Sequence, residues 1–219
     1  MITYESIKEN NDVKTYIECA DSSLKALGFT EHSYAHVGRV ASTAKYILET
    51  LDYPKHEVEL AQIAAHLHDI GNLVNRVDHS QSGAIMAFRI LSELGMPAED
   101  IATITTAIGN HDEGTGVAVN PVAAALIIAD KTDVRRTRVR NSDETTFDIH
   151  DRVNYSVENA DVSIDKENKL LYLKLTVDTK YGSIMDYFEI FMGRMLLCRK
   201  ATETLKLQFK LIINKQQLL

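Results

Sequence analysis

The chain has 219 residues, of which 45% are apolar and 25% are charged, a composition that is ordinary for a globular protein. This length suits one large domain, or one domain with an appendage. The net charge of −7 argues against a nucleic-acid scaffold, which would carry a basic patch or stripe, but a local basic cluster could still bind a small anionic substrate.

Apolar residues recur at helical spacing through most of the first 157 residues. Gly28 and Gly71 are expected to end the first and third helices, and Thr30 or Ser33 is expected to begin the second. The predicted helices cover residues 12–27, 33–51, 54–69, 80–94, 98–111, 121–130 and 148–157. Residues 72–78 are predicted to form a loop, and residues 113–116 a turn.

The hydrophobic period changes after residue 157. Residues 162–164 and 171–177 alternate as strands do, with a hairpin turn at 166–169. A long helix at 183–205 and a third strand at 207–213 follow. We therefore predict a mainly α fold: a helical domain over residues 1–157 and a small α+β appendage over residues 158–219, with about three strands and one long helix. The appendage is expected to pack on the helical domain or to form a homodimer.

The N-terminal sequence and the cysteines carry no sign of export. The first eleven residues lack the basic and then apolar pattern of a signal peptide, and the apolar runs are too short to span a bilayer. Cys19 and Cys198 have neither a disulfide-framework nor a metal-type spacing. These features predict a cytoplasmic protein with reduced thiols and no membrane partner.

His68 and Asp69 lie side by side at the end of residues 58–70, an apolar run with almost no charge. A buried, unpaired carboxylate costs several kcal/mol, so a buried Asp is usually paired or bound to metal. Imidazole and carboxylate are also ligands that zinc, iron and manganese accept. Further histidines and an aspartate stand at the ends of other predicted helices: His36, His79, His111 and Asp130.

Three short motifs together resemble those of the HD superfamily of metal-dependent phosphohydrolases. They are His-Val-Gly-Arg-Val at 36–40, His-Asp-Ile-Gly at 68–71 and Ala-Asp-Lys-Thr-Asp at 129–133, and the resemblance spans roughly residues 30–140. It implies an HD-domain helical bundle. It also implies that one metal ion is held by His36, His68, Asp69 and Asp130.

Two more segments, 78–84 and 110–113, are similar to those of family members that hold two metals. They imply a second ion bound by His79 and His111, with Asp69 as the bridging and catalytic carboxylate. Asp112 stands where such members have a second histidine. Asn72 replaces the lysine often found after His-Asp-x-Gly in cyclic-dinucleotide phosphodiesterases, and the Gly-Tyr-Pro motif of those enzymes is absent. Both departures argue against cyclic dinucleotides as substrates.

The function that the resemblance implies is hydrolysis of a small phosphate ester, for example a nucleotide, by a metal-activated water. Two divalent ions are expected, iron or manganese, with nickel, zinc and magnesium as alternatives. The residues expected to contact substrate are Lys131, Arg135, Arg76 and Asp133. Two other functions stay open: a di-iron oxygenase with the same six ligands, and a non-catalytic metal-binding interaction module.

Each proposed ligand also has an ordinary structural interpretation. His111 shares an apolar stripe with its neighbours and could be a core histidine, and His79 could only cap its helix. Asp130 could pair with Arg135 or Arg136. The remaining histidines are interpreted as surface, helix-start or core residues: His32, His56, His66 and His150.

Overall fold

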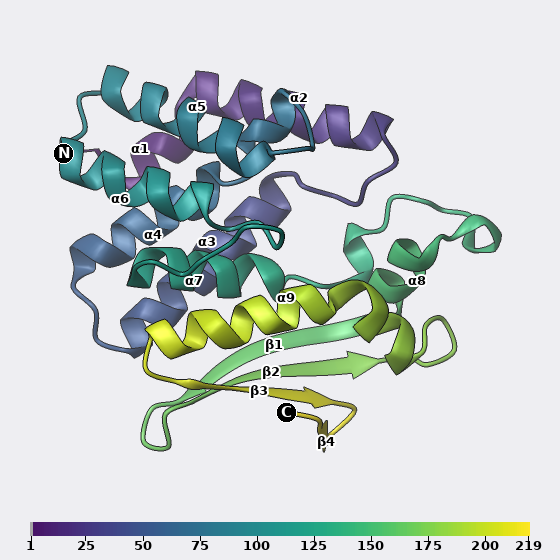
Figure 1. The fold of residues 1–219 in the computed structure, drawn as a ribbon. Coiled ribbons are helices and arrows are strands. Elements are labelled where there is room, and N and C mark those ends of the chain that lie inside the picture. Colours follow the sequence, from purple (N-terminus) through teal and green to yellow (C-terminus); the bar gives the residue numbers. More distant parts are fainter. Residues whose placement is uncertain (1) are drawn as a thin grey trace.

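The computed structural model describes residues 2–219, and its helices lie in layers on one side of a small sheet (Figure 1). The α-helices are α1 (Tyr4–Lys8), α2 (Asn11–Ala26), α3 (Tyr34–Thr50), α4 (Lys55–Leu67), α5 (His79–Glu93), α6 (Ala98–Gly109), α7 (Pro121–Lys131), α8 (Ile149–Ser156) and α9 (Ile184–Thr204). Three short 3₁₀ helices connect them: η1 (Ile70–Leu73), η2 (Arg136–Arg138) and η3 (Glu144–Thr146). The mainly α fold with a C-terminal α+β part is confirmed.

Several helices begin where a polar side chain can satisfy the free backbone N–H groups of the first turn. Ser33 accepts a hydrogen bond from the N–H of Ala35 at the start of α3. Asn120 does the same for Ala123 at the start of α7, which carries Pro121 in its first turn. These caps fix where the two helices start, and therefore where their later residues face.

Helix α7 is the centre of the helical part. All residues from Val122 to Lys131 are buried, because α7 packs against α3, α4 and α6 and also against α9. A helix that is apolar all round is expected in such a position. The packing carries Asp130, near the end of α7, into the middle of the molecule.

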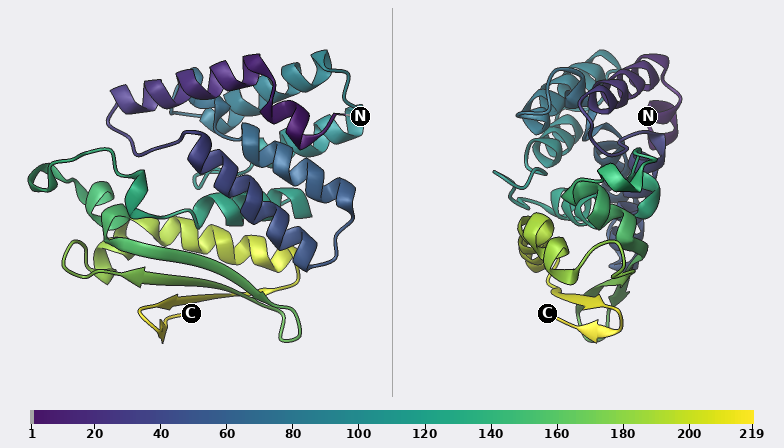
Figure 2. Two further views of the ribbon diagram at one scale, coloured as in Figure 1. Left: turned by 180° about the vertical axis from the view of Figure 1, so that it is seen from behind. Right: turned by 90° about the vertical axis from the view of Figure 1, so that its right-hand side faces the viewer.

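The sheet has four strands in the order β1-β2-β3-β4: β1 (Val157–Asp165), β2 (Leu170–Val177), β3 (Gln208–Ile213) and β4 (Gln216–Gln217). The β1–β2 and β3–β4 pairs are antiparallel, whereas β2 and β3 run parallel and are joined through α9. The inward side chains of β2, among them Leu171 and Leu173, are buried. Figure 2 shows α9 between this sheet and the helical part.

Five local features differ from the sequence prediction. Helix α1 and strand β4 were not expected, and the expected loop at 72–78 begins with η1. Gly71 was expected to end the third helix but lies inside η1. Helix α6 ends at Gly109, before His111, which was expected to be its last residue.

The apolar residues of the sheet and of α9 belong to the same core as those of the helical part. A division into two domains at residue 157, and a homodimer, remain predictions. Within the described part of the chain, no helix combines the length and the apolar character needed to cross a membrane.

Candidate metal centre

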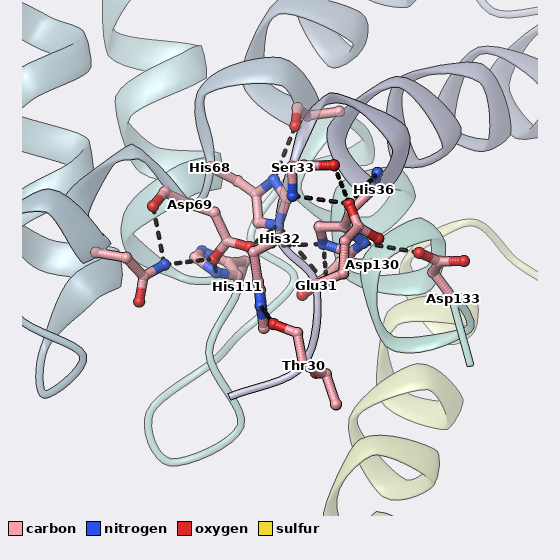
Figure 3. A network of polar contacts seen from close by, with 12 residues as sticks. Thr30, Glu31, His32, Ser33, His36, His68, Asp69, His111, Asp130 and Asp133 are labelled. Atoms are coloured by element: carbon pink, nitrogen blue, oxygen red, sulfur yellow. Dashed lines mark hydrogen bonds and ion pairs between the residues drawn. The ribbon is translucent and has the colours of Figure 1, made fainter. Parts of the chain in front are cut away.

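Four imidazoles and two carboxylates from five parts of the chain converge in the helical part, and Figure 3 labels all of them except His79. They lie in the first turn of α3, at the junction of α4 and η1, at the start of α5, just after α6 and near the end of α7. These residues are His36, His68 and Asp69, His79, His111 and Asp130, and all six are buried. The six side chains that the sequence analysis singled out therefore lie together.

One group of donor atoms is formed by His36, His68, Asp69 and Asp130. The Nε2 atom of His36 lies 3.5 Å from Asp69 Oδ2 and 3.4 Å from Asp130 Oδ1. The Nε2 atom of His68 lies 3.2 Å and 3.7 Å from the same two oxygens. Separations of this size suit donor atoms that share one ion at about 2.1 Å from each. His36, His68 and Asp130 can hold a metal ion in this arrangement.

The other oxygen of Asp69 faces a second group. Asp69 Oδ1 lies 3.5 Å from His79 Nε2 and 4.0 Å from His111 Nε2, and these two nitrogens are 3.2 Å apart. Asp112, which stands where two-metal relatives have a histidine, places Oδ1 4.0 Å from His79 Nε2. The Asp69 carboxylate is thus placed to bridge two ions.

The Nδ1 atom of each of the four histidines has an acceptor on the side away from the cluster. The contacts are His36 to Asp133 Oδ2 (2.7 Å), His68 to Ala65 O (2.7 Å), His79 to Arg76 O (3.1 Å) and His111 to Ile108 O (2.6 Å). Because a carbonyl or carboxylate oxygen only accepts, each Nδ1 carries a proton, and Nε2 is the nitrogen that can coordinate a cation.

The inner nitrogens of two of these histidines show that a metal ion fits the site. The Nε2 atoms of His36 and His68 are buried, and neither has a hydrogen-bond partner among the described residues. Buried polar atoms are otherwise almost always satisfied. A cation coordinated by both nitrogens and by the carboxylate of Asp69 would supply the missing partner.

The two carboxylates hold negative charge in this buried place. Burial raises the pKa of Asp69, but the charge of His68 outweighs burial and holds that pKa well below its usual range. Burial likewise raises the pKa of Asp130, and the charge of Lys131 holds it well below its usual range. Burial lowers the pKa of His68, yet the two carboxylates outweigh it and raise that pKa to about 10. The field at the cluster therefore favours positive charge between these groups.

Asp133 and Arg135, which the sequence analysis assigned to substrate, are paired behind His36. Asp133 Oδ1 lies 3.0 Å from Arg135 Nε and 3.2 Å from Arg39 Nε. Arg135 also reaches Glu31, with 2.9 Å between Nη2 and Oε2. The structure places Asp133 where it orients a histidine, so substrate contact by this pair remains a prediction.

Lys131 is buried beside the cluster and starts a chain of charges that the sequence did not reveal. Its Nζ lies 2.7 Å from Asp130 Oδ2 and 3.4 Å from Glu113 Oε2. Glu113 Oε1 in turn lies 2.8 Å from Nε of Arg194, on α9. The appendage therefore reaches the candidate metal ligands through one ion-pair network.

A cavity of about 210 Å³ opens beside the cluster, between the loop after α2 and helices α8 and α9. Arg76 lines it and lies close to the second group, with 3.4 Å from its Nη1 to His79 Nε2. His32, interpreted from sequence as a helix-start residue, also lines this cavity, and its ring centroid is 5.5 Å from that of His36.

Two other histidines lie apart from the cluster, in agreement with their ordinary interpretation. His56 pairs with Asp100, at 2.7 Å between Nε2 and Oδ1, with its side chain about half exposed. His66 is buried, with its ring packed edge-on against that of Tyr4 at 5.6 Å between centroids.

Comparison with known proteins supports the class that the motifs indicated. The family model of the HD domain matches residues 33–138, the segment that contains all six clustered residues. This match supports membership of the HD superfamily.

Two proteins illustrate how far the similarity extends. The chain is 25% identical over 204 residues to an uncharacterized protein of Methanocaldococcus jannaschii, an alignment that covers 82% of this chain and 77% of that protein. Since residues 1–138 are only 63% of 219 residues, that alignment extends into the C-terminal part. A crystal structure of a predicted HD superfamily hydrolase from an uncultured Thermotogales bacterium is 26% identical, with a TM-score of 0.45, covering 57% of this chain and 67% of that one.

Proposed function

We propose that the protein is a metal-dependent hydrolase of small phosphate esters. The observation that carries the proposal is the pair of buried, unpartnered Nε2 atoms of His36 and His68, which face the ionised carboxylates of Asp69 and Asp130. Side chains arranged in this way bind a divalent cation. The match of residues 33–138 to the HD domain model supports the same conclusion.

In the proposed site, His36, His68, Asp69 and Asp130 hold one ion, and Asp69, His79 and His111 hold a second. Two such ions, when bound, lower the pKa of water and withdraw charge from a phosphoryl group. Asp69 acts through both of its oxygens, because it is the carboxylate shared between the two groups. Lys131 neutralises the outer oxygen of Asp130 and keeps the inner oxygen directed at the first group.

The substrate is proposed to enter by the cavity beside the second group. Arg76 and Arg138 line this cavity, and a guanidinium matches the oxygens of a phosphate through paired N–H donors. The lining arginines supply charge that stabilises the oxygens of the reacting phosphoryl group. This cationic wall favours an anionic ester as substrate.

The test is hydrolysis by the full chain purified with manganese or iron. We expect release of phosphate from 4-nitrophenyl phosphate or from a small natural ester, and loss of both metal and activity in Asp69→Ala. Asp100→Ala, which removes a carboxylate paired with His56 outside the cluster, serves as the matched control and should keep both. Full activity in metal-stripped Asp69→Ala would contradict the proposal. Oxygen uptake by the iron form, without phosphate release, would instead support the oxygenase alternative.

A further inference from the structure

The cavity beside the cluster is built partly from elements that lie outside the matched HD domain. That match ends at residue 138, whereas residues of α8 and α9 also line the cavity. Part of the cavity lining is therefore a property of the C-terminal part of this chain.

Two of the arginines that line the cavity are held in place by other parts of the chain. Arg138 is buried, with Nε donating to the carbonyl of Glu31 and Nη1 to that of Asp133, both at 2.9 Å. Arg194 is fixed by Glu113, and its guanidinium carbon lies 4.4 Å from the ring centroid of Phe191. These side chains need little rearrangement to bind an anionic group, so the cost of ordering them on binding is small.

Side chains with acceptor oxygens on one face of α8 also line the cavity. Asp151 and Asn154 are three residues apart and both line the cavity. Asn154 is only 5% exposed, and its Nδ2 donates to the carbonyl of His150 at 2.9 Å. No donor to its Oδ1 is found among the described residues, so this oxygen is free to accept a hydrogen bond at the cavity wall. Asp148, the cap of α8, also lines the cavity.

We propose that Asp151 and Asn154 bind hydroxyl groups of the substrate, and that the substrate is a phosphate monoester of a small polyol or monosaccharide. This inference rests on the proposed function. Carboxylate and amide oxygens accept hydrogen bonds from hydroxyls, while the arginines of the cavity bind the phosphate.

Charge and size narrow the class of ligand. Three arginines and two aspartates line the cavity, and their net charge of +1 favours an anionic ligand. The volume of about 210 Å³ is below the roughly 300–1,000 Å³ of pockets that enclose drug-sized ligands. A pentose phosphate fits this volume, whereas the base of a nucleotide would remain outside.

The experiment compares three esters on the metal-loaded full chain: 4-nitrophenyl phosphate, a pentose 5-phosphate and the matching nucleoside 5′-monophosphate. We expect kcat/KM for the pentose phosphate to exceed that for each of the other two by about tenfold or more. Asp151→Ala and Asn154→Ala should each lower the ratio of pentose-phosphate to aryl-phosphate kcat/KM about tenfold, the effect of one lost hydrogen bond of about 1.4 kcal/mol.

Two controls separate this inference from the proposed function. Glu158→Ala removes a carboxylate outside the cavity and should leave the ratio unchanged. Calorimetry with the same pentose phosphate on metal-free protein gives a readout without turnover, and its Kd should rise about tenfold in Asp151→Ala. No turnover of any ester, the aryl phosphate included, contradicts the proposed function. Two outcomes contradict this inference alone, provided that the aryl phosphate is hydrolysed. One is a ratio of pentose-phosphate to aryl-phosphate kcat/KM that neither Asp151→Ala nor Asn154→Ala changes. The other is a higher kcat/KM for the nucleotide than for the pentose phosphate.

Discussion

Oδ2 of Asp133 accepts a hydrogen bond from Nδ1 of His36 at 2.7 Å, and this bond turns the other nitrogen of His36 toward Asp69 and Asp130. Carboxylates that hold a ligating histidine in this way also raise its basicity, and their loss typically weakens metal binding about 10–100-fold. Asp133 is therefore a positioning residue for the proposed first metal.

Asp133→Asn keeps the shape of this side chain but removes its charge. We expect the metal dissociation constant to rise about tenfold, measured by competition with a chromogenic chelator. Arg39→Gln is the matched control, since it removes a half-exposed partner of Asp133 but keeps the acceptor of His36. Unchanged metal affinity in Asp133→Asn would show that the carboxylate does not support the site.

The two groups of donor atoms predict how metal content changes with single substitutions. His111 belongs only to the second group, so His111→Ala should retain about one of two metal ions per chain, measured by element analysis of dialysed protein. Asp69→Ala removes the oxygens that face both groups and should lose both ions. A wild-type protein that binds a single ion, or equal content in wild type and His111→Ala, would contradict the two-metal arrangement.

The six clustered side chains were predictable because their placement is mostly local. His68, His79 and His111 each direct Nδ1 at the carbonyl three residues earlier, so the end of the preceding helix or turn already orients the ring. The order of these residues along the chain and their resemblance to the HD motifs then indicated that the six belong to one site. Metal binding by these residues itself remains a prediction.

The parts that were missed depend on contacts between distant residues. The link from Lys131 through Glu113 to Arg194 joins α7 to α9, and nothing in the local spacing of these charges reveals it. Helix α1 has five residues and buries only Ile7, too short a segment to show a helical period. Strand β4 has two residues and exists only by pairing with β3.

Gly71 is required by a close approach of two backbones next to Asp69. A Cβ atom built on Gly71 would overlap the carbonyl oxygen of His79 and the amide nitrogen of Gly83. Gly71→Ala should therefore lower the free energy of unfolding by about 3 kcal/mol, measured by chemical denaturation, and should weaken metal binding. Gly38→Ala is the control, because nothing lies within 4 Å of its Cβ position on α3. It should raise stability by about 0.5–1 kcal/mol, and a similar effect of both substitutions would contradict the packing argument.

Glu113 should make stability depend on pH in a defined range. Burial raises the pKa of Glu113, but Lys131 and Arg194 outweigh it and lower that pKa from 4.5 to about 2. Because the folded pKa is below the unfolded one, ionised Glu113 stabilises the fold above about pH 4.5, and this contribution is lost as pH falls toward 2. Glu113→Gln should be less stable than wild type at pH 7, with a difference in the free energy of unfolding that shrinks between pH 4.5 and 2. Glu93→Gln, on an exposed pair with Arg89, should show little difference at any pH. A difference for Glu113→Gln that stays constant from pH 7 to 2 would show that the ion pairs with Lys131 and Arg194 do not stabilise the folded chain.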